Sequence, residues 1–381
     1  MDNLRRLLYD EISTLLPTDK AIVVQGSRQV GRTTLLRKLT ERYDRVLWIN
    51  GDDILDREAW SDLDRTRLLT EVADYDCLVI DEAQRIRNVG LAIKLLVDAQ
   101  TGKAIFVSGS SSLDLNSSIS EALTGRKWTF ELFPFTYTEV ADDLGSKEAY
   151  RRLDQTLVHG SYPEVFTATH QVERRLRELA SAYLYKDVLE YGNVQKPDVL
   201  VKLLRAVAYQ IGSTASIHGI SKTVRVDAKT VDRYLALLSD SYVLFSLPPL
   251  SSNPRKELST SRKLYFYDNG IRNALIDDLR PYPARSDRGE LWENYVISEF
   301  TKAVAYAGRG GQLFFWRSRN QAEVDLILRR NGQLHAFEIK ANPNKRGRFP
   351  ASFRERYEPV TMETVHPDNF AEQLTRFREL L

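Results

Sequence analysis

The stretch Gly26–Thr33 reads G-S-R-Q-V-G-R-T and directly follows the apolar run Ala21–Val24. It has the spacing G-x-x-x-x-G-K-[ST] of a phosphate-binding P-loop, except that Arg32 occupies the usual lysine position. In such a loop small residues let backbone N–H groups turn inward, and the dipole of the following helix adds to the attraction for phosphate. We therefore predict a site for ATP and Mg²⁺ formed by Gly26, Ser27, Arg28, Gln29, Val30, Gly31, Arg32, Thr33 and Thr34.

The composition of the chain is that of a folded protein with more than one domain. Of its 381 residues, 43% are hydrophobic and 28% are charged, and the length exceeds the needs of one ordinary core. No apolar run approaches the roughly 18 residues of a membrane span, and the N-terminal residues lack the pattern of a signal peptide. The single cysteine, Cys77, cannot form an internal disulfide. We expect a cytoplasmic protein, in which a net charge of +2 leaves any basic surface local.

Four short apolar runs alternate with helical stretches in the N-terminal third. Continuous apolar strands between helices indicate a parallel sheet that is covered on both faces. The third run ends in Asp81 and Glu82, which belong at the carboxyl edge of the sheet beside the P-loop. We predict that Asp81 and Thr33 hold Mg²⁺ and that Glu82 polarises the attacking water. The four runs are Ala21–Val24, Arg45–Ile49, Cys77–Ile80 and Ala104–Val107.

Three further residues bear on the chemistry of the nucleotide. We choose Ser110, in the hydroxyl-rich stretch Ser108–Ser112, as a sensor of the γ-phosphate. Arg126 is a candidate charge finger for the nucleotide of its own or a neighbouring subunit, or else a solvated surface residue. The planar guanidinium of Arg32 can neutralise phosphate but differs in shape from an ammonium, so we expect nucleotide binding with slow hydrolysis. The alternative is a degenerate P-loop that is kept only as a turn.

Residues 113–190 are predicted to be mostly helical. Their two histidines, His159 and His170, have no metal-ligand spacing to cysteines or carboxylates, and we interpret both as ordinary surface or turn residues.

The pattern from Val199 to Leu250 changes to two helical stretches, a third helix capped by Asp227, and an apolar run. This is the outline of a winged-helix module, whose third helix normally enters a DNA major groove. Lys229 and Arg233 lie on one face of that helix, so the module either binds DNA or packs against protein. The buried stripe of the same helix is predicted to be Val231, Leu235 and Leu238.

Two alternating stretches, Glu323–Leu328 and Leu334–Lys340, flank the strong hairpin signal Asn331-Gly332. A two-residue turn fixes the register so that Asp325 lies opposite Glu338, and Glu323 lies opposite Lys340. Strand alternation places these four charged residues on one side. The other side, towards a core, would hold Val324, Leu326, Leu328, Phe337 and Ile339.

Two carboxylates directly opposite each other repel by about 0.2–1 kcal/mol, so a structural hairpin gains nothing from Asp325 and Glu338. A divalent cation reverses the sign, because Mg²⁺ prefers carboxylate oxygens together with water and phosphate. Lys340 beside them would orient the attacking water or stabilise developing charge. We predict metal-assisted phosphodiester hydrolysis at these three residues. The alternative is an exposed hairpin with cross-strand salt bridges.

Glu293 shares a helical stripe with Val296, Ile297 and Phe300, and a core-facing carboxylate needs a partner. The metal is our candidate partner, which makes Glu293 a further catalytic residue. Downstream, a basic segment suits a phosphate backbone or is simply a solvated loop. Its residues are Lys340, Lys345, Arg346 and Arg348.

Taken together, these residues resemble a prokaryotic family in which an AAA-type ATPase domain precedes a C-terminal domain of restriction-endonuclease-like fold. The resemblance implies an ATPase with a helical lid, a winged-helix segment and a PD-(D/E)xK-type nuclease fold. In that fold the motif residues map to Asp325, Glu338 and Lys340, and the helix-borne acid to Glu293. Arg32 departs from the lysine usual in the family. The matching stretches are Gly26–Thr34, Cys77–Gln84, Ser108–Ser112, Gly125-Arg126, Gly160–Glu164, Lys263–Gly270, Gly289–Asn294 and Glu323–Lys340.

The expected fold class is α/β. Residues 1–135 would form the P-loop parallel-sheet core, 136–195 a helical lid, 196–255 a winged-helix-like segment, and 256–381 a mixed α/β restriction-endonuclease-like domain. The expected function is ATP-controlled, Mg²⁺-dependent processing of DNA. Two alternatives stay open: a non-catalytic nucleotide switch whose nuclease-like domain is a docking surface, and a transcription factor that uses the winged helix alone.

Overall fold

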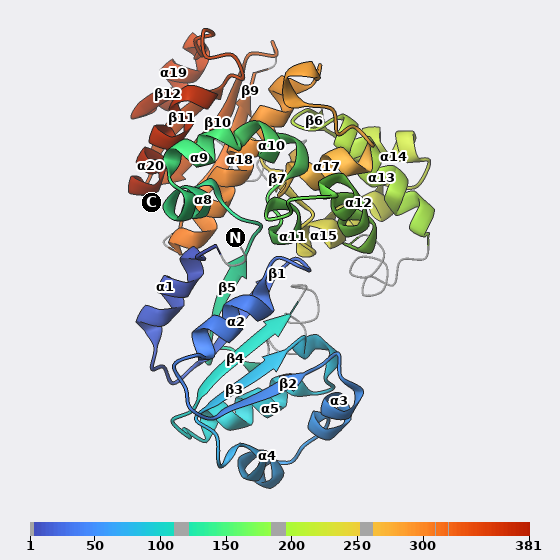
Figure 1. Cartoon of the computed structure of the whole chain (residues 1–381). Coiled ribbons are helices and arrows are strands. Elements are labelled where there is room, and N and C mark those ends of the chain that lie inside the picture. Colours follow the sequence, from blue (N-terminus) through green and yellow to red (C-terminus); the bar gives the residue numbers. More distant parts are fainter. Residues whose placement is uncertain (1–3, 110–121, 184–195, 252–261, 309, 319) are drawn as a thin grey trace. The chain divides into compact units, whose positions relative to one another are not determined.

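The computed structural model describes the chain except residues 1–3, 110–121, 184–195, 252–261, 309 and 319 (Figure 1). The described residues divide into two compact units. The first holds the residues up to Phe133 together with Asp240–Tyr242, and the second holds the other residues from Pro134 onward. Within the described residues, no helix combines the length and the apolar character needed to cross a membrane.

The first unit is built on a sheet of parallel strands. They are β1 (Ala21–Gly26), β2 (Val46–Asn50), β3 (Cys77–Asp81), β4 (Ala104–Gly109) and β5 (Lys127–Leu132). The strand order is β2-β3-β4-β1-β5, and every neighbouring pair runs parallel. The four predicted strands and the parallel sheet are confirmed. We missed β5 because it is an edge strand with exposed residues such as Trp128, so it shows no continuous apolar run.

Helices cover both faces of this sheet (Figure 1). They are α1 (Leu7–Leu15), α2 (Arg32–Thr40), α3 (Ile54–Trp60), α4 (Arg65–Val72) and α5 (Val89–Asp98). Trp60, Leu68 and Ile93 of α3, α4 and α5 pack in one cluster with Val23 of β1. Because strand side chains alternate, Val24 points to the opposite face, where α1 and α2 pack against each other.

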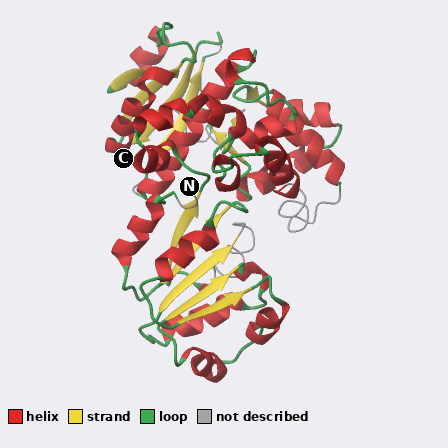
Figure 2. Cartoon of the chain, in the orientation of Figure 1, coloured by secondary structure: helices red, strands yellow, loops and turns green. Residues whose placement is uncertain are grey.

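The second unit begins with helices, as predicted (Figure 2). They are α8 (Tyr137–Leu144), α9 (Ser146–Arg151), α10 (Leu153–His159), α11 (Pro163–Phe166) and α12 (Val172–Tyr183). His159 at the end of α10 is half-buried, and its ring Nδ1 has no hydrogen-bond partner among the described residues. His159 thus lies at a turn, which agrees with its interpretation as an ordinary surface or turn residue, although the side chain is half-buried. His170 is exposed, as expected.

A helix, a short strand, two helices and a strand pair follow in the second unit. They are α13 (Pro197–Tyr209), β6 (Thr214–Ala215), α14 (Ile217–Val224), α15 (Ala228–Asp240), β7 (Leu244–Leu247) and β8 (Arg262–Phe266), with the sheet order β6-β8-β7. Asp227 caps α15, since its carboxylate accepts the Thr230 N–H at 2.8 Å. Val231 and Leu238 are buried and Leu235 is partly buried, as predicted.

The C-terminal part of the second unit is a mixed four-stranded sheet between helices. Its elements are α18 (Arg288–Ala307), β9 (Gln312–Arg317), β10 (Glu323–Arg330), β11 (Gln333–Ile339), α19 (Ala351–Tyr357), β12 (Thr361–Val365) and α20 (Phe370–Glu379). The order is β12-β11-β10-β9, with only β11 and β12 parallel. Phe300 of α18 and Phe377 of α20 pack on Phe337 of β11, while Phe353 of α19 packs against Trp316 of β9.

The predicted hairpin register is confirmed from Leu326 to Arg330, whereas the expected pairing of Glu323 with Lys340 is not seen, since Glu323 contacts Lys263 and Arg317 instead. Arg330 pairs with Gln333 and Leu326 with Phe337, so the turn has two residues. Asn331 and Gly332 have φ of 51° and 79°, the left-handed conformation that such a turn requires and that this residue pair tolerates.

A β-bulge interrupts β10 where it pairs with β9, since the register shifts between Val324 and Ile327. Because of the extra residue, Val324 packs in the same apolar cluster as Ile327 and Ala336. We expected Val324 on the face of Leu326. That expectation is wrong, because simple alternation does not pass through a bulge.

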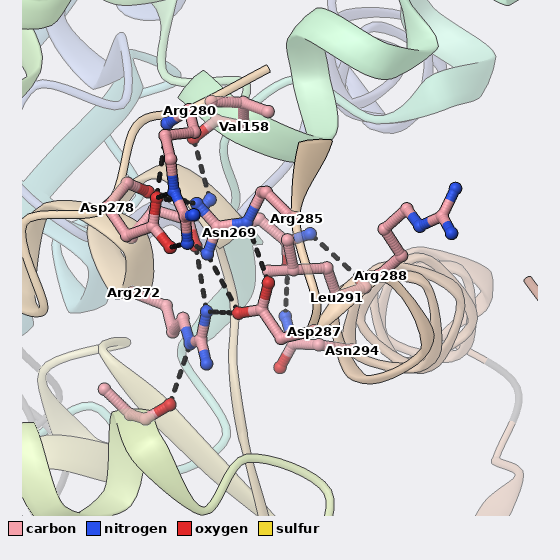
Figure 3. A network of polar contacts seen from close by, with 12 residues as sticks. Val158, Asn269, Arg272, Asp278, Arg280, Arg285, Asp287, Arg288, Leu291 and Asn294 are labelled. Atoms are coloured by element: carbon pink, nitrogen blue, oxygen red, sulfur yellow. Dashed lines mark hydrogen bonds and ion pairs between the residues drawn. The ribbon is translucent and has the colours of Figure 1, made fainter. Parts of the chain in front are cut away.

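A buried network of arginines and acids ties α17 (Asn269–Leu275) to the start of α18 (Figure 3). Arg272 contacts Asp287 at 2.5 Å, and Arg285 contacts Asp287 at 2.8 Å and Asp278 at 3.2 Å. The Arg285 side chain is fully buried. Figure 3 also shows Asn269, whose amide donates to the Leu291 carbonyl at 3.0 Å. These contacts hold the start of α18 in place, and α18 is the helix that bears Glu293.

Candidate functional site

The loop after β1 is shaped by two glycines. A Cβ on Gly26 would lie 2.3 Å from the Leu132 carbonyl oxygen, so only glycine lets β1 approach β5 there. Gly31 has φ 100° and precedes the first turn of α2. Behind the loop, the buried Arg6 donates to the Val30 carbonyl at 2.9 Å and also to the Phe133 carbonyl. The loop is thus held in the strand–turn–helix context that the P-loop pattern requires.

Arg32, the residue in the unusual position, forms a buried ion pair with Glu82. Its Nη2 lies 2.5 Å from Glu82 Oε1, and its Nη1 donates to the Gly26 carbonyl at 3.2 Å. The Arg32 and Glu82 side chains are 4% and 14% exposed. The predicted phosphate ligand and the predicted base are therefore in direct contact.

Thr33 and Asp81, the predicted Mg²⁺ ligands, also meet. The Thr33 hydroxyl donates to Asp81 Oδ2 at 2.7 Å, and the Ser108 hydroxyl donates to Asp81 Oδ1. The Glu82 N–H contacts Ser108 Oγ at 3.2 Å, and Glu82 has the uncommon φ of 50°. Two hard oxygen donors side by side at a helix start suit Mg²⁺ beside nucleotide phosphates.

The remaining loop residues differ in exposure. Ser27 and Val30 are buried, Arg28 is partly buried, and Gln29 and Thr34 are exposed. Ser110, our predicted phosphate sensor, lies outside the described residues.

In the second unit, three predicted residues converge on one point. Lys340 Nζ lies 2.7 Å from Glu338 Oε2 and 3.2 Å from Asp325 Oδ2. The Ile339 N–H donates to the same Asp325 oxygen at 2.7 Å. Glu338 is buried, whereas Asp325 and Lys340 retain 14% and 28% exposure, so the point is open to solvent from one side.

Glu293 has protein partners. Lys263 Nζ of β8 lies 3.0 Å from its Oε1, and the Tyr265 hydroxyl donates to the same atom at 2.6 Å. Lys263 also pairs with Glu323, which has Arg317 at 3.7 Å on its other side. The partner that Glu293 was expected to need is therefore supplied by the protein itself, and a role of Glu293 at a metal stays a prediction.

We define the carboxylate–lysine network as Lys263, Glu293, Glu323, Asp325, Glu338 and Lys340. Its four carboxylates face two ammonium groups, which leaves a negative excess within the network. Burial and the charge of Asp325 raise the pKa of Glu338 to about 7. Burial also raises the pKa of Glu293, although Lys263 opposes that rise. A cation that entered would relieve this excess.

The donor set fits one small divalent cation with outside ligands. No group of three or more His, Cys, Asp or Glu side chains is arranged to hold a metal anywhere in the described parts of the chain. Asp325 and Glu338 supply two carboxylates, and Mg²⁺ is often bound through one or two carboxylates with water and substrate phosphate completing the octahedron. Lys345, Arg346 and Arg348 are exposed nearby in sequence.

Comparison with known proteins identifies the first unit. A family model described as an AAA domain matches residues 18–141. The structure also resembles the Walker-type ATPase of Pyrococcus abyssi with a TM-score of 0.50 and 14% identity, covering 72% of this chain and 96% of that one. Residues 18–141 are a P-loop AAA-type ATPase domain.

Beyond the ATPase domain, two family models described only as domains of unknown function match residues 150–281 and 288–374. Uncharacterised proteins of Mycobacterium bovis and Mycobacterium tuberculosis are each 29% identical over 328 residues, which cover 84% of this chain and 70% of theirs. An uncharacterised protein of Methanocaldococcus jannaschii is 24% identical, covering 96% of this chain and 86% of its own.

One predicted residue of the ATPase domain lies far from its P-loop. Arg126 precedes β5, its carbonyl accepts the Ala21 N–H, and its side chain pairs with Asp98 at 2.5 Å. It therefore lies at the amino edge of a sheet whose P-loop follows the carboxyl end of β1, a strand about 20 Å long. The expectation that Arg126 serves the nucleotide of its own chain is wrong. The alternative with a neighbouring subunit stays a prediction.

Sequence reasoning missed four residues that contact the predicted ones. Ser108 and Gln84 adjoin the acidic pair of the ATPase domain, and Lys263 and Tyr265 contact Glu293. The first two lie inside quoted motifs, so adjacency could have found them. Lys263 directly precedes the apolar residues Leu264, Tyr265 and Phe266 of β8, and a lysine beside such a run indicates a buried acid elsewhere in the chain.

Proposed function

We propose that the protein is an ATP-dependent DNA-processing enzyme, in which the ATPase domain controls a Mg²⁺-dependent phosphodiesterase site in the second unit. The single observation that carries the phosphodiesterase is the convergence of Lys340 on Asp325 and Glu338. Carboxylates this close repel each other, and a fold that retains them at a solvent-accessible point has a use for a cation there.

In the ATPase domain, Arg32 would neutralise the β- and γ-phosphates. Thr33 and Asp81 would hold Mg²⁺, and Glu82 would accept a proton from the attacking water. The fold and the family match already support a P-loop ATPase domain, and the proposal adds the roles of these residues in ATP binding and hydrolysis.

In the second unit, Asp325 and Glu338 would hold Mg²⁺, which when bound polarises a phosphodiester and lowers the pKa of water. Lys340 would release these carboxylates and donate to a phosphate oxygen or orient the attacking water. The backbone N–H of Ile339 keeps Asp325 in place throughout.

DNA is the proposed substrate because the second unit also holds a helix–strand–helix–helix–strand–strand segment, α13 to β8. The order α13, α14, α15 and β7 is consistent with the winged-helix outline proposed for residues 196–255, and Lys229 and Arg233 of α15 are both exposed. Exposed basic residues on such a helix suit phosphate contacts at a major groove.

The test is a cleavage assay with the full chain on linear and supercoiled DNA, with Mg²⁺ or Mn²⁺ and with or without ATP. Asp325→Asn and Lys340→Ala should each lose about 10²–10⁴-fold in rate while nucleotide binding stays intact. Glu363→Gln on the neighbouring β12 is a matched control and should cleave like wild type. Equal cleavage by wild type and both site variants rules the site out.

A second candidate function is a nucleotide switch without nuclease activity. It is favoured by the ion pairs that Lys263 and Lys340 already form with Glu293 and Glu338. A domain that serves only for docking would also show such pairs. Absence of DNA cleavage and of metal binding in the second unit, with ATP binding preserved, would select this reading.

A further inference from the structure

The contact between Arg32 and Glu82 sets two requirements against each other. In the proposed ATP chemistry, on which this inference rests, Arg32 must bind phosphate and Glu82 must contact the attacking water. In this structure the two side chains occupy each other instead, since Arg32 Nη2 lies 2.5 Å from Glu82 Oε1.

Both oxygens of Glu82 are occupied. Oε1 takes Arg32, and Oε2 accepts the Gln84 side-chain amide at 2.7 Å. A carboxylate whose oxygens are both engaged, one of them by a guanidinium, is a poor acceptor for the proton of water. In this arrangement Glu82 is not available as a base.

A phosphate would compete with Glu82 for the same guanidinium edge. Arg32 is almost completely buried, and its other terminal nitrogen is already directed at the Gly26 carbonyl. Because Nη1 is directed at the Gly26 carbonyl, Glu82 and a phosphate in the loop would compete for the donors of Nη2. Moving Arg32 away from Glu82 is costly, so the exchange requires that Arg32 gain a stronger anionic partner in the phosphates.

We propose that Arg32 is a two-position switch. Without nucleotide it neutralises Glu82, and with nucleotide it moves to the phosphates and releases Oε1 of Glu82. Water then attacks the γ-phosphorus, the bond to the β-γ bridging oxygen breaks, and the proton of water passes to Oε1. Gln84 keeps its contact with Oε2 and is a positioning residue.

The same exchange favours a ligand that carries a metal. Thr33 follows Arg32 directly and donates its hydroxyl to Asp81 at 2.7 Å. Opening the Arg32–Glu82 pair and the Thr33–Asp81 bond together requires an anion for the first and a cation for the second. A Mg²⁺–nucleotide complex supplies both, whereas free nucleotide supplies one.

The test measures equilibrium affinity of the full chain for Mg²⁺ with a non-hydrolysable ATP analogue, so that turnover does not enter. Glu82→Gln removes the competitor of the phosphate and should tighten analogue binding by roughly 5- to 150-fold. Glu41→Gln is the control for net charge, because Glu41 is exposed on the same domain and pairs with the exposed Lys38. It should stay within about twofold of wild type.

Gln84→Ala gives a second readout. It should lower kcat for ATP by about 10²-fold with little change in analogue affinity, a split that a merely structural role would not produce.

The outcomes separate the switch from the proposed function. Wild-type chain that binds and hydrolyses ATP, with Glu82→Gln and Glu41→Gln binding the analogue equally, overturns the switch alone. Wild-type chain that does not bind the analogue overturns the ATP chemistry and the switch with it.

Discussion

Lys263 and Glu293 form a buried ion pair across the second unit, with Nζ 3.0 Å from Oε1 and the lysine side chain 3% exposed. Burial alone would lower the pKa of Lys263, but Glu293 and Glu323 outweigh it and hold the pKa above its usual value. The ammonium therefore stays charged and neutralises acids that would otherwise repel one another.

Lys263→Met should destabilise the second unit by about 3–5 kcal/mol, because it removes the buried counter-charge of Glu293 and leaves Glu323 with Arg317 alone. Denaturant unfolding of the full chain, monitored by a probe in the second unit, measures the loss of unfolding free energy. The neighbouring exposed Arg262→Met is the control and should unfold like wild type. Equal unfolding of the two variants would contradict the role assigned to Lys263.

Arg285 and Arg280 provide a matched pair, since both contact Asp278 (Figure 3). Arg285 is fully buried, whereas Arg280 is 62% exposed. Arg285→Met should cost about 3–5 kcal/mol of unfolding free energy, because Asp278 and Asp287 lose a buried partner. Arg280→Met should change the unfolding midpoint little, because water screens an exposed pair. A larger loss for Arg280→Met than for Arg285→Met would contradict the structure.

His159 predicts a pH dependence of stability. Burial lowers its pKa, with Glu173 acting in the opposite direction. Between the lowered pKa and the unfolded value of 6.5, the unfolded chain binds more protons than the folded chain, so the free energy of unfolding falls as the pH falls below about 6.5.

The free energy of unfolding of His159→Gln, measured between about pH 7.5 and about pH 5.5, should fall less steeply with decreasing pH than that of wild type. The exposed His170→Gln should keep the wild-type slope. Parallel slopes for wild type and His159→Gln would show that His159 is not the group responsible.

Gly26→Ala tests the geometry of the P-loop. Its Cβ would lie 2.3 Å from the Leu132 carbonyl oxygen, so the loop or β5 must shift. Nucleotide affinity should fall by about 10²-fold, since a shift of about 1 Å misplaces the phosphate donors. Gly289→Ala, where nothing lies within 4 Å of the new Cβ, should bind like wild type. Unchanged affinity in Gly26→Ala would mean that the loop does not hold the phosphates.

Sequence patterns predicted the ATPase domain well because its signals are local. The P-loop spacing, each apolar run and the acidic pair are each contained within a few consecutive residues. The edge strand β5 escaped because exposure replaces its apolar run with alternation, and Arg126 was misplaced because its distance from the P-loop depends on strand direction.

The second unit was predictable where a turn fixes geometry and not where distant segments meet. Asn331-Gly332 fixed the pairing of β10 with β11, which brought Asp325 and Glu338 towards Lys340. The bulge at Val324 follows from pairing with β9, and Lys263 reaches Glu293 from a strand that no local pattern links to α18. Such contacts depend on tertiary packing.

The most direct measurement of the central claim is calorimetric titration of the nucleotide-free full chain with Mn²⁺, comparing wild type with Glu338→Gln and the control Glu363→Gln. We predict that wild type and Glu363→Gln bind one Mn²⁺ in the second unit and that Glu338→Gln loses it. Retention of the same binding by Glu338→Gln, or absence of binding in wild type, would contradict a metal-dependent site at Asp325, Glu338 and Lys340.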